Sequence, residues 1–133
     1  MDVNEFLAQP LVARVAAAGP SVRPVWFIWE EGAFWWLTGS YSKLGRELDV
    51  DPRLALVVDT CELSSGRVLS VTCRGTARVV PLDRERALRK LRRYLGPQED
   101  QWPARFIAPL DDPTSGMICF TPDRPPSLLD LSW

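Results

Sequence analysis

Residues 23–58, RPVWFIWEEGAFWWLTGSYSKLGRELDVDPRLALVV, decide the fold of this chain. β-branched and aromatic residues dominate the first part of this segment, and the Glu-Glu-Gly sequence at 30–32 interrupts them as a turn signal. Such a pattern predicts a hairpin, with one strand at 22–29 and its partner at 33–38. The segment therefore begins as an antiparallel β structure.

The second part of the segment predicts a short helix between two strands. Small polar residues fill 39–42, and the hydroxyl of Ser42 is expected to accept a free backbone N–H at the start of a helix over 43–49. An Asp-Pro pair ends this helix. The apolar run at 54–58 is typical of a buried strand.

Further elements are predicted outside this segment. Alternation is clearest in a long strand at 69–79, where Gly75 permits a bend. Its expected apolar face holds Leu69, Val71, Cys73, Gly75, Ala77 and Val79. Apolar residues three or four apart predict a helix that opens at 81–83 and runs to about residue 95. The remaining expectations are a helix at 3–9, strands at 11–17 and 116–121, an exposed hairpin loop at 61–67, a loop or short helix at 98–112, and a tail whose Leu128, Leu129, Leu131 and Trp133 pack against the rest. Strands joined by turns outnumber helices, so we expect one mainly β domain over 1–133, an antiparallel barrel with peripheral helices.

Composition narrows the function classes. The chain has 133 residues and a formal charge of −1, which gives no sign of a nucleic-acid partner or a membrane surface. No apolar run is long enough to span a membrane, and the start lacks the order of a signal peptide. Three widely spaced cysteines suggest reduced thiols in a cytoplasmic protein. Histidine is absent, which disfavours a triad hydrolase, a zinc enzyme and a haem ligand, so we expect a borrowed cofactor to supply any chemistry.

The order of motifs resembles the flavin-binding core of the pyridoxamine-phosphate-oxidase-like family. The matching pieces are Pro24-Val25-Trp26-Phe27, Leu37-Thr38-Gly39, Ser42-Lys43, Leu48, Asp51-Pro52-Arg53, the run 54–58 and the strand 73–77. The resemblance covers about 11–80 well and the last third loosely. It implies a six-stranded antiparallel split barrel of the FMN-binding type and a homodimer with the cofactor between its two barrels.

The polar loop is the expected phosphate site. Small residues, a glycine, a lysine and a helix N-terminus suit an anion, although an ordinary turn with a serine cap needs no ligand. The resemblance implies that Thr38, Gly39, Ser40, Ser42 and Lys43 hold the phosphate, that Pro24, Val25 and Trp26 lie under the ring, and that Val57 and Val58 flank it. Relatives usually carry a basic residue eight positions before the proline of the Asp-Pro-Arg motif, where this chain has Leu44.

The sequence leaves two possible roles open for each of two groups of side chains. The aromatic residues of the hairpin can fill the barrel with one set and line a groove or a dimer surface with the other. The arginines and Lys90 of the helix at 84–95 form either a solvated face or a docking surface for an anion.

The expected function is a flavin-binding oxidoreductase that transfers a hydride to a small molecule, with no identifiable catalytic acid or base. FMN is preferred over a deazaflavin because the site looks small and no second basic pocket is visible near Lys43. The alternative is a non-catalytic split-barrel binding module that has lost its phosphate site, as Leu44 suggests.

Overall fold

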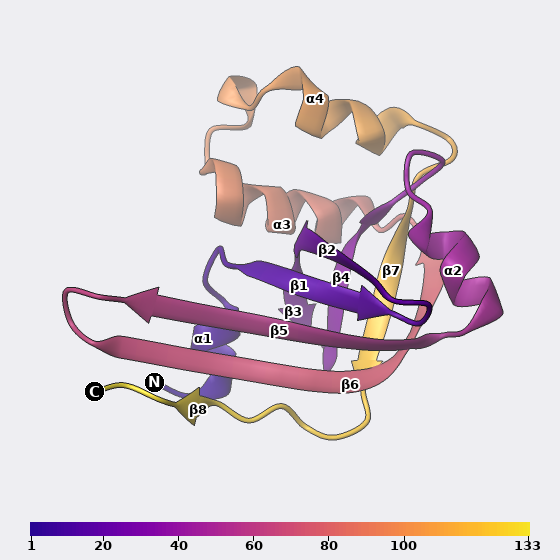
Figure 1. Cartoon of the computed structure of the whole chain (residues 1–133). Coiled ribbons are helices and arrows are strands. Elements are labelled where there is room, and N and C mark those ends of the chain that lie inside the picture. Colours follow the sequence, from indigo (N-terminus) through magenta and orange to yellow (C-terminus); the bar gives the residue numbers. More distant parts are fainter.

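The fold, seen in a computed structural model that describes residues 1–133, is built around one antiparallel sheet. Its strands are β1 (Val12–Ala17), β2 (Ser21–Trp26), β3 (Ile28–Glu30), β4 (Ala33–Thr38), β5 (Arg53–Glu62), β6 (Arg67–Pro81), β7 (Gly116–Pro122) and β8 (Leu129–Asp130). They pair in the order β2-β1-β5-β6-β7-β4-β3, and β8 adds to β6 (Figure 1). The mainly β prediction is confirmed.

The two ends of this order are joined by one residue, and this closes the barrel. β2 pairs with β1, β3 pairs with β4, and only Phe27 separates β2 from β3 in the chain. The sheet must therefore curl until its edges meet. The prediction of one continuous strand at 22–29 is wrong because the chain changes partners at Phe27. If β2 and β3 count as one strand and the short β8 is set aside, six strands remain.

Helices cover the barrel on several sides. They are α1 (Val3–Leu7), α2 (Leu44–Val50), α3 (Arg84–Leu95) and α4 (Ala104–Ile107), with 3-10 turns η1 (Glu99–Gln101) and η2 (Ala108–Asp111). In Figure 1, α3 and α4 form a layer over one side of the sheet, and α2 lies at the end where β6 leads toward α3. The predicted helices at 3–9, 43–49 and 81–95 are confirmed, with ends shifted by a few residues. None of these helices combines the length and apolar character needed to cross a membrane.

Tyr94 of α3 fixes the break between β2 and β3. Its hydroxyl accepts the Phe27 N–H at 3.0 Å and donates to the Leu11 carbonyl at 2.7 Å. The backbone at Phe27 belongs to no strand, so its polar groups need such partners. The Tyr94 ring also stacks on Trp26, with centroids 4.5 Å apart. Through this one side chain, α3 holds the closing point of the barrel.

The barrel interior follows the predicted alternation. Phe34 and Trp36 of β4 point inward and are buried with Phe120 of β7. On β6 the inward residues are buried as predicted, except that Val79 is 50% exposed, because it lies beyond the core beside α2, where it lines a hollow. Gly75 is required by close packing: a Cβ there would lie 2.1 Å from the Thr121 carbonyl oxygen.

The β5–β6 hairpin extends as a long arm from the barrel (Figure 1). Its strands pair out to Glu62 and Arg67, so the predicted loop at 61–67 shrinks to a turn at 63–66. The C-terminal tail pairs along this arm, with the Trp133 N–H donating to the Gly66 carbonyl at 3.0 Å. The expectation that the tail side chains pack is wrong for Leu129, Leu131 and Trp133, which stay more than half exposed. Hydrogen bonds hold this segment instead, through backbone pairing with β6 and through the Ser132 hydroxyl, which accepts the Val68 N–H at 2.9 Å.

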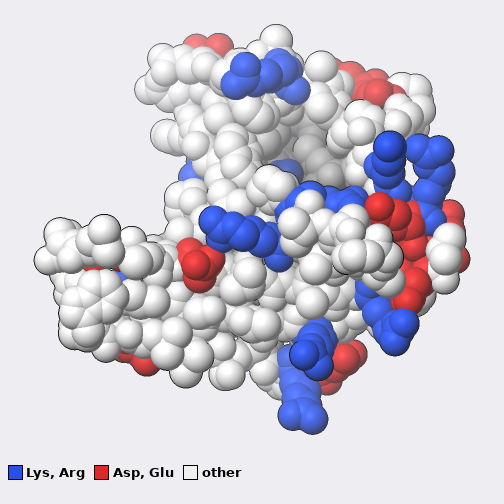
Figure 2. Space-filling model, in the orientation of Figure 1, with Lys and Arg blue, Asp and Glu red and all other residues white.

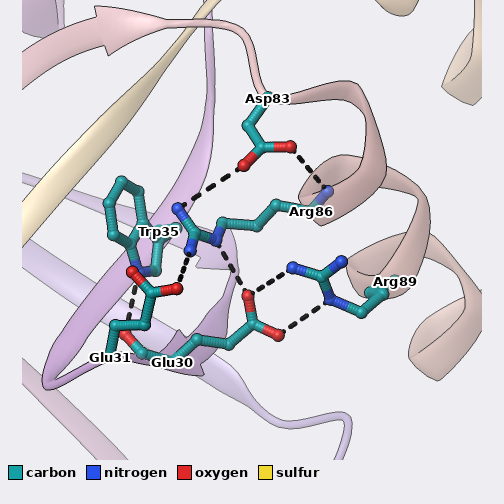
Figure 3. Close-up of polar contacts among 6 residues, drawn as sticks. All are labelled: Glu30, Glu31, Trp35, Asp83, Arg86 and Arg89. Carbon is teal, nitrogen blue, oxygen red and sulfur yellow. Dashed lines mark hydrogen bonds and ion pairs between the residues drawn. The ribbon is translucent and has the colours of Figure 1, made fainter.

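An ion-pair cluster joins α3 to the β3–β4 turn (Figure 3). Arg86, only 8% exposed, pairs with Glu30 at 2.8 Å and stacks 3.7 Å above the Trp35 ring. The hydrogen bond from Arg89 lowers the pKa of Glu30, and burial opposes this effect. Together with the hydrogen bond from Arg86, it brings the pKa of Glu30 to about 2. Lys90 is also buried, which lowers its pKa to about 8. The prediction of a solvated basic face is therefore wrong for Arg86 and Lys90, because the sheet covers that side of the helix.

Candidate functional site

A groove of about 480 Å³ lies between β2, β4 and the loop that leads into α2. Figure 2 shows the surface hollowed between the α3–α4 layer and the β1–β2 side of the barrel. The lining is half apolar and carries three charged side chains. Its residues are Val22, Arg23, Pro24, Val25, Trp36, Leu37, Tyr41, Ser42, Lys43, Leu44 and Glu47. This volume falls within the roughly 300–1,000 Å³ of small-molecule sites.

The groove brings together part of the predicted site. Pro24 and Val25 come from β2, and Ser42 and Lys43 come from the loop before α2. A second hollow adjoins the groove, shares Ser42 with it, and is lined by Gly39 and Ser40. Two segments that are far apart in the sequence thus meet around one opening.

The other predicted residues lie outside this opening. Thr38 is 5% exposed at the end of β4, and Val58 is fully buried in the barrel core. Val57 lies on the opposite face of β5 from Val58 and is partly exposed. Trp26 stacks on both Tyr94 and Phe106, so rings of this same chain already cover it.

Local hydrogen bonds explain the shape of the polar loop. The Ser42 N–H donates to the Gly39 carbonyl at 3.0 Å, and the Ser42 hydroxyl accepts the Leu44 N–H at 3.2 Å. Ser42 thus accepts a free N–H at the start of α2, as predicted, but from the position before the N-cap, which is Lys43 and has no side-chain cap bond. The Ser42 hydroxyl proton stays free to donate. Gly39 is needed because a Cβ would lie 2.6 Å from the Tyr41 ring. Ser40 is held from the other side by Thr114 at 3.2 Å.

Leu44 is a core residue. Its side chain is 1% exposed and packs in the barrel cluster, so the first turn of α2 contributes an apolar anchor at this position. Lys43, next to it, is exposed, and its side chain makes no hydrogen bond or ion pair within the chain. The cation that relatives place at position 44 is thus replaced by packing, and Lys43 stays available to a ligand.

Sequence reasoning missed two charged residues of the groove, Arg23 and Glu47. The Arg23 Nη2 donates to Glu47 Oε2 at 2.6 Å and to the Ser21 hydroxyl at 2.7 Å. Both side chains of the pair are partly buried, at 23% and 31% exposed. A signal existed in the sequence: Glu47 follows Lys43 by four residues, which places both on one side of a helix.

Comparison with known proteins gives a consistent result. The model of the pyridoxamine 5′-phosphate oxidase family matches residues 2–123. Similar structures include a FAD-binding protein from Mesorhizobium loti (18% identity, 96% of this chain and 91% of that chain, TM-score 0.65) and an F420 reductase (22% identity, 95% and 94%, TM-score 0.63). Another is HutZ, a haem storage protein from Vibrio cholerae (14% identity, 96% and 90%, TM-score 0.68). No curated protein sequence matches.

Proposed function

This chain belongs to the pyridoxamine 5′-phosphate oxidase family, and from that premise we propose that it binds a flavin in the groove between β2, β4 and α2. FMN is the preferred form because of the resemblance to the FMN-binding split barrels, and a deazaflavin is the alternative. Structural relatives named for FAD and F420 support a flavin-type cofactor in general. A bound flavin accepts and returns a hydride, which makes the protein an oxidoreductase acting on a small molecule. The groove carries the proposal because it combines an apolar wall with an unpaired lysine.

The chain's own residues fit such a cofactor. Val25 and Leu37 offer apolar surface to a flat ring, whereas Trp36 belongs to the barrel core and is only 3% exposed. The strand Pro24–Val25 lies on the same groove. Lys43 has no partner in the chain, so it can pair with a phosphate, and the Ser42 hydroxyl can donate beside it. These residues bind and orient the cofactor. No side chain of the groove is assigned a catalytic proton transfer.

The rim of the groove supports a symmetric homodimer, in which a second copy covers the cofactor. Val22 is 72% exposed, Tyr41 is 59% exposed and Val50 is 88% exposed, all close to the opening or on α2. Apolar side chains grouped at one place favour an interface. Sedimentation of the flavin-loaded protein should give a dimer, and a monomer at micromolar concentration would contradict the shared site.

A titration of two flavins tests the phosphate assignment. Lys43→Ala should weaken FMN binding by about 1.5–3 kcal/mol, the value of a charge-assisted hydrogen bond. Riboflavin has no phosphate and should bind unchanged. Arg78→Ala serves as the control because Arg78 is exposed on β6, outside the groove.

The outcomes separate the competing functions. Equal losses for FMN and riboflavin would remove Lys43 from the phosphate site. If neither flavin binds and F420 also fails, the second candidate stands: a non-catalytic module with an apolar ligand. The burial of Leu44 in place of a cation favours that candidate.

A further inference from the structure

We propose that Glu47 is a selectivity residue of the groove: its carboxylate competes with the cofactor's phosphate for Arg23. This inference rests on the proposed function, because it concerns the same groove and the same ligand. It predicts that Lys43 alone supports the discrimination between phosphorylated and unphosphorylated flavins in this chain, and that a neutral side chain at position 47 would raise this discrimination further.

The geometry shows an anion already bound to the groove arginine. Glu47 Oε2 lies 2.6 Å from Arg23 Nη2 and accepts a second hydrogen bond from the Ser21 hydroxyl at 3.3 Å. Ser21 in turn accepts from Arg23 at 2.7 Å, so the three side chains form a closed triangle. A carboxylate held by a guanidinium and a hydroxyl occupies the kind of donor set that a phosphate oxygen uses.

This pair differs from the other ion pairs of the surface. Arg14 and Asp59 also lie 2.7 Å apart, but their side chains are 57% and 46% exposed. The Arg23 and Glu47 side chains are only 23% and 31% exposed, and both line the groove. Partial burial strengthens their attraction because fewer water molecules screen it. A ligand entering the groove therefore meets an arginine that is engaged, not free.

The charge balance of the lining points the same way. Arg23, Lys43 and Glu47 are the charged side chains that line the groove, which leaves a net charge of +1. A phosphate monoester carries about −1.5 to −2 at pH 7. With Glu47 ionised, only Lys43 offers an unpaired cation. Removing the Glu47 charge would leave two cations for one phosphate.

The test compares FMN and riboflavin affinities by quenching of flavin fluorescence. Glu47→Gln keeps the size of the side chain and removes its charge. We expect it to tighten FMN binding about tenfold, the effect of one charge-assisted hydrogen bond becoming available, with riboflavin changed less than twofold. Asp59→Asn is the matched control, since it removes the carboxylate of the Arg14 pair outside the groove and should change neither affinity.

A double variant identifies the competing group. In Arg23→Gln the substitution at Glu47 should no longer tighten FMN binding, because the arginine it would release is gone. Glu47→Ala is a second variant that removes the carboxylate. A thermal melt of each variant shows whether it is folded, which separates a loss of folding from a loss of binding. Unchanged or weaker FMN binding by folded Glu47→Gln, with riboflavin still bound, overturns this inference alone. If neither flavin binds the wild type or Glu47→Gln, the proposed function falls with it.

Discussion

Replacing Leu44 by lysine restores the charge that relatives carry, but at a position that the barrel core occupies. Leu44 is 1% exposed and belongs to the main apolar cluster. An ammonium placed there must either stay buried or pull the start of α2 away from the barrel. We therefore expect Leu44→Lys to destabilise the protein and to leave FMN affinity unimproved.

The expected cost can be built from two parts. A leucine side chain buried as fully as this one contributes about 1.5–3 kcal/mol relative to an exposed one. Lysine keeps part of this through its methylene stem, because Leu44 also lines the groove and its replacement can extend the charge toward water. Incomplete hydration of the ammonium adds a penalty of its own. Together these give a loss of about 2–4 kcal/mol, a large share of the roughly 5–15 kcal/mol of a typical domain.

Urea unfolding followed by tryptophan fluorescence measures the loss. With a slope of about 2 kcal/mol per molar, the middle of the usual range, the midpoint should fall by about 1–2 M. Leu63→Lys is the control, because Leu63 is 78% exposed at the β5–β6 turn, outside the groove and its rim, so the unfolding free energy should change by no more than about 0.5 kcal/mol. A Leu44→Lys protein as stable as the wild type, or one that gains FMN affinity in a salt-sensitive manner, would refute the placement of Leu44 in the core.

Two further predictions concern the frame around the site. Tyr94→Phe removes the hydroxyl that hydrogen-bonds the Phe27 and Leu11 backbone groups. We expect urea titrations to show an unfolding free energy lower by about 1–3 kcal/mol. A smaller loss would mean that water replaces the hydroxyl. Glu30 has its pKa lowered from 4.5 to about 2, so its ionised form stabilises the fold above pH 4.5, and that contribution is lost as the pH falls toward 2. The unfolding free energy of the wild type should therefore drop between pH 5 and pH 2 by on the order of 2 kcal/mol more than that of Glu30→Gln, and parallel pH profiles would contradict the ion-pair cluster.

Local patterns predicted the strands well and failed where the barrel closes. The residues at 22–29 form one unbroken β-rich run, so nothing in their sequence marks the break at Phe27. The break arises because two edges of a curled sheet meet there, and the Tyr94 hydroxyl, 67 residues away, supplies the missing backbone partner. A contact over that distance has no local signature.

The helix α3 shows a second limit of periodicity. The stripe through Ala87 and Leu91 was predicted, and it packs with Trp102 and Leu110. Periodicity alone places Arg86 and Lys90 in solvent, because a single apolar stripe implies that only one face of the helix is covered. The sheet covers another face, where Arg86 is satisfied by Glu30 and by the Trp35 ring. A charged residue was buried because its partners came from a distant turn.

The sequence analysis predicted the location of the candidate site better than it predicted which charged side chains there are paired. The loop before α2 and the strand β2 do meet, but no local pattern predicts that Arg23 pairs with Glu47, because the two residues are 24 positions apart. The Arg23–Glu47 pair and the buried Leu44 both lower the positive charge that the groove offers to a phosphate. In a groove with one unpaired lysine, the proposed phosphate contact loses part of its contribution to flavin affinity, and contact of the ring with Val25 and Leu37 gains in relative weight. For a flavin bound there as proposed, we expect the ring to contribute more of the affinity than the phosphate.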